Sequence, residues 1–202
     1  MERYDVIIIG GGPAGLGCAL TLASAKGHFE WGENRKYLVI DNNSSDLLKA
    51  KLNNVPGIKP GSLGKEVIQE LKEHTKMYGN VEIIDGRVIK VEGEYKNFKV
   101  ITEDGKEFFS DFVVFATGFH EFNIECEGVE VIENIKSPRP GKVQLKVDED
   151  YKIKEGMYAA GLIAGVSTMF AAAAGSGVQV ACNIQAIMSG KNVVVHDVPE
   201  SK

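Results

Sequence analysis

The hydrophobic pattern of the chain begins with a strand, a glycine-rich turn and a helix. Residues 4–9 form an apolar, β-branched run that is typical of a strand covered on both faces. The glycine turn over 10–15 is followed by a predicted helix over about 14–25 and by an apolar strand over 37–40 that ends at Asp41. This order of elements is the unit that builds a parallel sheet.

Further short elements follow a polar, loop-like stretch over 41–60. A helix is predicted over 63–78, with one face formed by Leu63, Val67, Leu71, His74 and Tyr78. A hairpin turn at 103–106 lies among short predicted strands over 81–84, 87–91, 98–102 and 108–110. Later predictions are apolar strands over 112–116 and 157–160, a connection over 121–142 and a helix over 175–189. The pattern predicts an α/β fold with a parallel central sheet and a small antiparallel β-meander.

The chain has 202 residues, which predicts one domain, over 1–190, followed by a tail over 191–202. It is 44% apolar and 25% charged, as folded proteins are. Its formal charge of −5 argues against nucleic acid as the main partner, which requires a basic face. Three isolated cysteines form no disulfide framework and no zinc spacing, and no signal peptide is visible, so we expect a cytoplasmic protein.

Residues 156–190 contain no charged side chain, over a length greater than the roughly 20 residues of a membrane helix. The segment is nevertheless interrupted by glycines and by polar Ser, Thr, Gln and Asn residues. A buried strand, a glycine turn and an internal helix explain it better, and we predict no membrane span.

The glycine turn carries the clearest chemical signal. Gly10, Gly12 and Gly15 match the G-x-G-x-x-G motif after a strand and at the start of a helix, which is the context that a dinucleotide pyrophosphate requires. Asp41 ends the second strand, where an acid can accept hydrogen bonds from ribose hydroxyls. It lies beyond the usual spacing of about 20 residues because 26–36 is a long polar connection. The motif does not distinguish FAD from NAD, but Asp41 would repel the 2′-phosphate of NADP.

Other segments occur in a characteristic order. They are Asp41-Asn42, Asn54-Val55-Pro56-Gly57, Ala116-Thr117-Gly118, Gly156-Met157-Tyr158-Ala159-Ala160-Gly161 and Ala174-Gly175-Ser176-Gly177. With the glycine turn, they make the chain, from about Arg3 to Ser189, resemble the FAD-binding half of the thioredoxin-reductase-like pyridine nucleotide–disulfide oxidoreductases.

The resemblance implies a three-layer, Rossmann-like FAD/NAD(P)-binding fold with FAD as a noncovalent cofactor. In that family the glycine turn holds the pyrophosphate and the acid holds the adenosine ribose. By the same resemblance Asn54 approaches the flavin, the backbone near Val88 meets the adenine, and the Ala116–Gly118 turn passes the cofactor. The cofactor-binding residues that it implies are Gly10, Gly12, Pro13, Ala14, Gly15, Asp41, Asn42, Asn54, Val88, Ala116, Thr117, Gly118, Gly161 and Leu162.

The chain also departs from the family. Residues 119–142 stand where the family inserts a nicotinamide-binding domain, and neither a second G-x-G-x-x-G nor a Cys-x-x-Cys is present. Cys18 and Cys182 are predicted to be buried in helices, and Cys126 to be exposed in a connection. Leu162 replaces an aspartate that binds a ribityl hydroxyl in the family. We expect the loss of this hydrogen bond to weaken FAD binding without excluding it.

The remaining candidate residues receive simpler interpretations. His28, His74, His120 and His196 are scattered, so no metal site is predicted. His74 is expected on a helix face. His120 follows the Ala-Thr-Gly-Phe turn and either approaches a ligand or, as we expect, is an ordinary loop histidine. Met169 and Phe170 either cover the isoalloxazine ring, as their position in the family implies, or belong to the core.

These observations predict a single-domain FAD-dependent oxidoreductase that is related to thioredoxin reductase but cannot reduce disulfides by itself. No catalytic residue is identified. The alternatives are a non-catalytic flavin- or NAD-binding subunit or sensor within a complex, and an NAD site that serves another oxidoreductase. We expect NAD(P)H or a separate reductase chain as the electron donor. We also expect a homodimer, because the missing domain would leave apolar surface uncovered.

Overall fold

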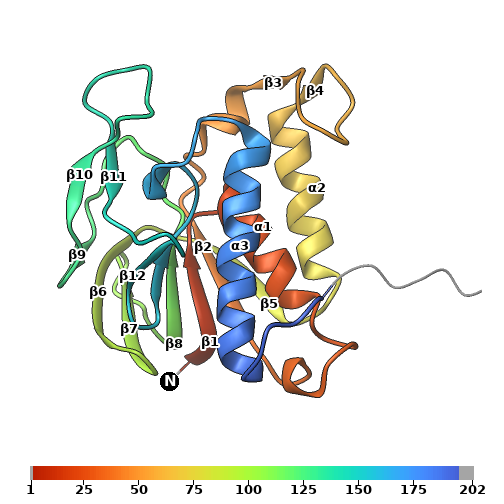
Figure 1. Ribbon diagram of the computed structural model, residues 1–202, viewed down its shortest axis with the longest axis vertical. Coiled ribbons are helices and arrows are strands. Elements are labelled where there is room, and N and C mark those ends of the chain that lie inside the picture. The colour runs from red at the N-terminus through yellow and green to blue at the C-terminus, as the bar shows by residue number, and fades with distance from the viewer. Residues whose placement is uncertain (1, 196–202) are drawn as a thin grey trace, which may run out of the picture.

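The computed structural model describes residues 2–195 and is built around a parallel sheet (Figure 1). The first strand, β1 (Glu2–Ile9), lies between β2 (Tyr37–Asp41) and β8 (Glu107–Phe115). The outer parallel strands are β5 (Val81–Asp85), which pairs with β2, and β13 (Met157–Ala159), which pairs with β8. The predicted parallel sheet is confirmed, and the carboxyl ends of these strands meet at one edge, where α/β folds bind ligands.

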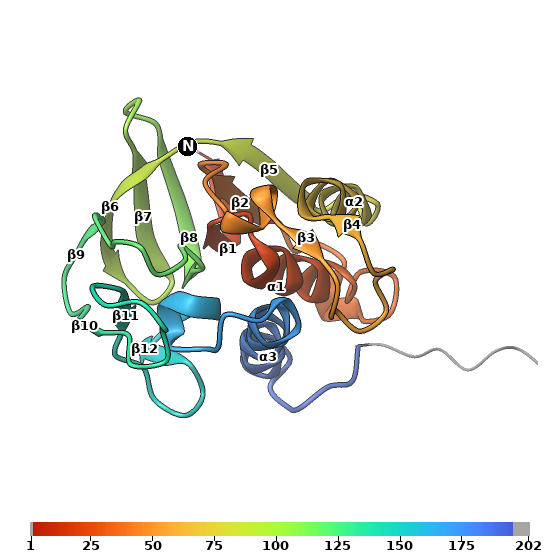
Figure 2. The same ribbon diagram turned by 90° about the horizontal axis from the view of Figure 1, so that it is seen from above.

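Alternate residues of the sheet point into two separate cores. Val6 and Ile8 of β1 face the helices α1 (Pro13–Ala23) and α3 (Phe170–Ser189). Ile7 and Ile9 face the opposite side. There they pack with the antiparallel meander formed by β6 (Val88–Glu94), β7 (Asn97–Thr102) and the first half of β8. Helices, sheet and meander make the three predicted layers (Figure 2).

The helix α2 (Gly64–Lys76) lies beside α1 on the helical side of the sheet (Figures 1 and 2). Its buried residues are Gly64, Val67, Ile68 and Thr75. The predicted apolar face is therefore wrong in part, because Leu63 precedes the helix and is exposed, and His74 is also exposed. The expectation of His74 on a helix surface is confirmed.

Two close contacts between α1 and α3 explain why each of these helices has a glycine where the other helix approaches. A Cβ atom at Gly177 of α3 would overlap the carbonyl oxygen of Ala14, and one at Gly17 of α1 would lie 2.8 Å from the carbonyl oxygen of Ala174. The missing side chains let the two helix backbones approach each other. The helix α3 begins at Phe170 and not at Gly175, because Ala171–Ala174 are strong helix formers.

The meander contains a second difference from the prediction. The expected strands over 108–110 and 112–116 are one continuous strand, β8. Asp111, the polar residue between them, forms an ion pair with Arg3 of the neighbouring strand, so its charge is accommodated without a break. The hairpin turn predicted at 103–106 is confirmed between β7 and β8.

Short elements occupy the remaining connections. The predicted connection over 121–142 contains β9 (Glu125–Cys126), which pairs with β6, and β10 (Val131–Glu133), which pairs with β11 (Val143–Leu145). Two further strand pairs use β3 (Lys51–Leu52) with β4 (Ser62–Leu63), and β12 (Lys152–Lys154) with β13. Three 3-10 turns complete the chain: η1 (Glu30–Gly32), η2 (Asp46–Lys49) and η3 (Gly161–Ala164).

Within residues 2–195, none of the helices combines the length and apolar character needed to cross a membrane. The uncharged segment over 156–190 contains β13, η3 and α3. The buried strand and the internal helix predicted for this segment are therefore confirmed. His196 and the end of the predicted tail lie outside the described residues.

Candidate functional site

The glycine turn connects β1 to the N-terminus of α1, and its glycines have different local reasons. Gly10 has a φ of +116° and a Cβ atom there would overlap the carbonyl oxygen of Ala116. A Cβ atom at Gly15 would overlap the carbonyl oxygen of Gly10. At Gly12, by contrast, the nearest atom is the Ser45 hydroxyl oxygen at 3.4 Å. Gly10 and Gly15 therefore permit packing, whereas a Cβ atom at Gly12 would make only an ordinary contact.

Gly12 lines a cavity of about 520 Å³ at the carboxyl ends of the parallel strands. Its volume falls within the range of roughly 300–1,000 Å³ that is usual for ligand and cofactor pockets. Of the residues predicted to bind a cofactor, all except Gly15 line this cavity. Gly15 is buried beneath the turn, where it allows the turn and helix to pack.

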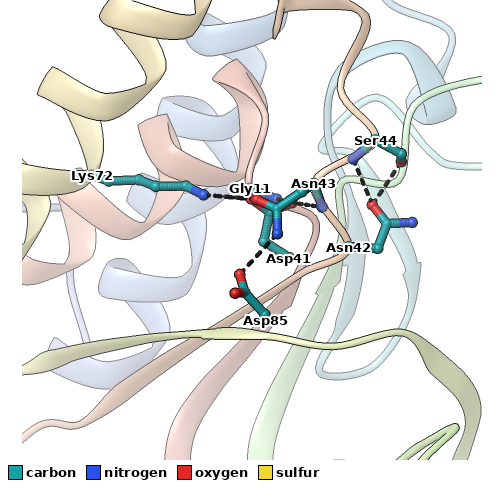
Figure 3. Close-up of polar contacts among 7 residues, drawn as sticks. All are labelled: Gly11, Asp41, Asn42, Asn43, Ser44, Lys72 and Asp85. Carbon is teal, nitrogen blue, oxygen red and sulfur yellow. Dashed lines mark hydrogen bonds and ion pairs between the residues drawn. The ribbon is translucent and has the colours of Figure 1, made fainter.

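Asp41 ends β2 beside the glycine turn and is only 4% exposed. Its Oδ1 accepts hydrogen bonds from the backbone N–H groups of Gly11 (3.2 Å) and Asn43 (3.0 Å). Its Oδ2 lies 2.7 Å from the Lys72 ammonium of α2 (Figure 3). Asp41 is thus in the position that the motif predicts, but it is not an isolated negative charge. The expected repulsion between Asp41 and a 2′-phosphate stays a prediction, and it concerns a carboxylate that is paired with Lys72.

The loop after Asp41 is held by its own polar side chains. The Asn43 side-chain amide donates to Asp85 of β5 over 2.8 Å, and its oxygen lies 3.3 Å from the Lys72 ammonium. The Asn42 side-chain oxygen accepts hydrogen bonds from the backbone and hydroxyl of Ser44 (Figure 3). These bonds fix the cavity wall formed by Asn42 and Ser44.

Thr117 lies in the turn that follows β8 and lines the same cavity. Its hydroxyl is buried and has no hydrogen-bond partner in the structure. Burial of a hydroxyl without a hydrogen-bond partner costs free energy, and a ligand with a matching polar group would offset that cost. The cavity therefore offers an unused polar group as well as a largely apolar wall.

Met169 and Phe170 line the cavity at the start of α3. Met169 is 46% exposed and Phe170 is partly exposed, so neither residue belongs to the core. Of the two interpretations of this pair, the core interpretation is wrong. Their place in the cavity wall is compatible with covering a ligand.

Leu162, in η3, is partly buried and lines the cavity. Its carbonyl oxygen accepts a hydrogen bond of 2.9 Å from the side-chain amide of Asn134, which is itself 4% exposed. Asn134 follows β10, so the short segment over 119–142 directly supports this part of the wall. Leu162 presents no side-chain hydrogen-bonding group to the cavity.

His120 also lines the cavity, in the segment after β8. Its Nδ1 lies 2.7 Å from the Lys142 ammonium, which can only donate, so Nε2–H is assigned as the donor to Asp46, at 2.8 Å. His120 is an exposed loop residue, as expected, and its place in the cavity wall is also compatible with the alternative that it approaches a ligand.

Sequence reasoning missed several members of this wall. Ser45, Asp46 and Arg87 line the cavity, as does the run over 119–124. Arg87 directly precedes Val88, whose backbone the resemblance implies near the adenine, so the sequence indicates this part of the wall but not Arg87 itself. Lys72 lies outside the wall, in a helix whose polar positions carry no motif, and nothing in the sequence pairs it with Asp41.

The cysteines lie apart from the cavity. Cys18 is fully buried, as predicted, whereas Cys126 and Cys182 are both partly buried, so the predictions of an exposed Cys126 and a buried Cys182 need correction. Burial raises the pKa of all three thiols, which disfavours the reactive thiolate. Among residues 2–195, no group of three or more His, Cys, Asp and Glu side chains could hold a metal ion.

Comparison with known proteins agrees with this arrangement. Residues 4–180 match the family model described as pyridine nucleotide-disulphide oxidoreductase. The thioredoxin reductase of Aquifex aeolicus is 36% identical over 131 residues, which cover 63% of this chain and 38% of that enzyme. The chain thus matches well under half the length of this curated relative.

Solved structures show the same fold. A thioredoxin reductase from Gloeobacter violaceus aligns with a TM-score of 0.76 and 16% identity, covering 99% of this chain and 100% of that one. A ferredoxin-flavin thioredoxin reductase from Clostridium acetobutylicum aligns with a TM-score of 0.69 and 21% identity, covering 94% and 99%. With most of its length matched by the family model, the chain belongs to the pyridine nucleotide-disulphide oxidoreductase family.

Proposed function

We propose that this domain binds FAD noncovalently and acts as an FAD-dependent oxidoreductase. The observation that carries the proposal is the place of Gly12 at the N-terminus of α1, in the wall of a cavity of cofactor size. A helix N-terminus supplies free N–H groups and the positive end of the helix dipole, which suit a pyrophosphate. Family membership supports FAD as the dinucleotide.

Within this proposal, each part of the cavity wall has a role. The backbone over Gly12–Ala14 holds the pyrophosphate, and Asp41 accepts a hydrogen bond from the adenosine ribose. The backbone near Val88 contacts the adenine, while Asn54 and the unpartnered Thr117 hydroxyl lie toward the flavin. When bound, FAD supplies the capacity to accept and donate electrons, and the chain supplies binding and orientation.

The chain should not reduce disulfides by itself. Its three cysteines are separated in sequence and unpaired, and none lines the cavity. Electrons would therefore leave the flavin for an acceptor other than a dithiol of this chain. NAD(P)H or a separate reductase chain is the proposed electron donor.

A second candidate function is a flavin- or NAD-binding module without catalytic activity of its own. The observation that favours it is Leu162, which offers no polar side-chain group where the family has an aspartate. Such a module would hold a nucleotide within a larger complex.

Calorimetric titration of nucleotide-free protein with FAD and, separately, with NAD tests the proposed ligand. We expect FAD to bind more tightly, because membership of this family supports FAD as the dinucleotide. Tighter binding of NAD would refute FAD as the cofactor. Oxidation of NADH or NADPH by the FAD-loaded protein with an artificial acceptor then separates the enzyme from the module.

A further inference from the structure

We propose that Lys72 is a positioning residue, which orients the Asp41 carboxylate toward an adenosine ribose and so sets how strongly the site prefers a ribose with its hydroxyl groups. The inference rests on the proposed binding of an adenine dinucleotide. Lys72 does not line the cavity, so it acts through Asp41 (Figure 3).

The contact between the two side chains is largely shielded from water. The Lys72 Nζ lies 2.7 Å from the Asp41 Oδ2, and the side chains are 17% and 6% exposed. Exposed ion pairs contribute little because water screens them, but an ion pair with this degree of burial interacts more strongly. Lys72 thus gives a buried carboxylate a counter-charge from a neighbouring helix.

The same contact restricts the orientation of the carboxylate. An aspartate side chain has a broad terminal torsion, so Asp41 requires contacts to hold one orientation. Its Oδ1 is held by the N–H groups of Gly11 and Asn43, and Lys72 holds Oδ2 from α2. A carboxylate offers about four acceptor sites, so these three bonds leave about one for a ligand. Lys72 therefore determines which part of Asp41 faces the cavity.

Lys72 also secures the loop that follows. It donates a second, longer hydrogen bond of 3.3 Å to the side-chain oxygen of Asn43, whose backbone has a φ of +55°. The same Asn43 bonds to Asp85, so α2, the loop and the end of β5 form one network (Figure 3). The network contains two acids and one base, and Lys72 is the only cation in it among the residues drawn.

The test compares ADP with 2′,3′-dideoxy-ADP, which lacks the ribose hydroxyls, by calorimetry. We expect wild type to bind ADP about tenfold or more tightly than the dideoxy compound, as a hydrogen bond to a charged acceptor implies. Lys72→Met should lose about tenfold in affinity for ADP and change its affinity for the dideoxy compound by less than about twofold. The preference should therefore nearly disappear.

Two further variants control the comparison. Lys76→Met makes the same substitution at an exposed position of the same helix and should keep the wild-type preference. Lys72→Arg retains a charged donor and should restore most of the preference. If Lys72→Met does not fold, Lys72→Gln is tested in its place. For Lys72→Gln, the ratio of the affinity for ADP to the affinity for 2′,3′-dideoxy-ADP should lie between one and the wild-type ratio.

The possible results distinguish a failure of the proposed role of Lys72 from a failure of the proposed nucleotide binding. If wild type binds neither nucleotide, the proposed function fails and the inference fails with it. If wild type prefers ADP and the Lys72 variants keep that full preference, only the inference is overturned. An equal loss of affinity for both nucleotides would show that Lys72 merely stabilises the fold, and this also overturns it.

Discussion

At the scale of single residues, the site depends on which glycine positions can accept a side chain. Gly12 lines the cavity, and a Cβ atom there would contact only Ser45, whereas Gly10 and Gly15 lie against backbone atoms. All three glycines belong to one motif, but the surroundings of Gly10 and Gly15 give them packing roles, and the contact with a ligand is predicted for Gly12. These roles can be separated by substitution.

The first prediction is that Gly12→Val abolishes FAD binding and leaves the protein folded. The added side chain enters the cavity, where only the Ser45 hydroxyl is near, and competes with the pyrophosphate. Gly15→Ala is the contrasting variant: its Cβ overlaps the Gly10 carbonyl, so it should cost about 1–3 kcal/mol of stability. FAD titration and thermal unfolding distinguish the two. Full FAD occupancy in Gly12→Val would mean that the pyrophosphate lies elsewhere.

A second prediction concerns Leu162, an apolar residue of the cavity wall. Leu162→Asp provides the acceptor that the resemblance implies for the family and should tighten FAD binding by about tenfold or more, since a hydrogen bond to a charged group contributes about 1.5–3 kcal/mol net. Leu162→Asn is the neutral control and should give a smaller gain. If the aspartate variant binds FAD no better than wild type, Leu162 reflects a rearranged cavity wall.

At the scale of elements, the sequence predicted the order of the main strands and helices because each carries a strong local pattern. Failures occur where tertiary contacts decide the outcome. The polar residue Asp111 separates the two strands predicted within β8. Its ion-pair partner Arg3 lies in the neighbouring strand of the sheet but far away in the sequence. The strands β9 to β12 have only two or three residues each, too few for a periodic pattern. Lys72 illustrates the same limit at the site, because its partner lies 31 residues away.

The third prediction tests the contact between α1 and α3. Gly177→Ala forces a Cβ against the Ala14 carbonyl and should destabilise the fold by about 1–3 kcal/mol, which lowers Tm by about 2–4 °C per kcal/mol at this chain length. Gly175→Ala is a matched control in the same helix, because nothing lies within 4 Å of the added atom. It should be neutral or stabilise the helix by up to about 1 kcal/mol. Equal unfolding temperatures for the two variants would contradict the close packing.

At the scale of the whole molecule, residues 119–142 contain β9, β10 and a cavity-lining loop, at the place where the resemblance implies an inserted nicotinamide domain in the family. Asn134 and His120 of this segment contact the cavity wall or form part of it. The segment therefore contributes to the proposed flavin site, but it is too short for the βαβ units of a nucleotide-binding domain. This shapes the expected reactions of the chain.

The fourth prediction is that the FAD-loaded protein does not reduce thioredoxin and reacts slowly with free NADH. Among the described residues no dithiol is adjacent to the cavity, and residues 119–142 are too few for a domain that orients the nicotinamide. Stopped-flow absorbance should show reduction whose rate rises with NADH concentration and saturates poorly. Replacement of all three cysteines should lower stability, mainly through buried Cys18, and leave this rate unchanged. Tight, saturable NADPH binding with fast reduction would reveal a nicotinamide site.

The fifth prediction is self-association, most simply as a two-fold dimer. Two large apolar side chains that are exposed, Ile135 (84%) and Val131 (46%), lie within residues 119–142. Light scattering of the FAD-loaded protein measures the mass. A strict monomer across the accessible concentration range would contradict the prediction and leave the cofactor assignment unaffected.

The most direct test of the central claim is the visible absorption spectrum of the purified protein after incubation with FAD and removal of the unbound nucleotide. The account predicts flavin absorption bands and about one FAD released per chain on denaturation, as a single noncovalent site requires. A colourless, folded protein that retains no FAD under these conditions would contradict the assignment of this cavity to FAD.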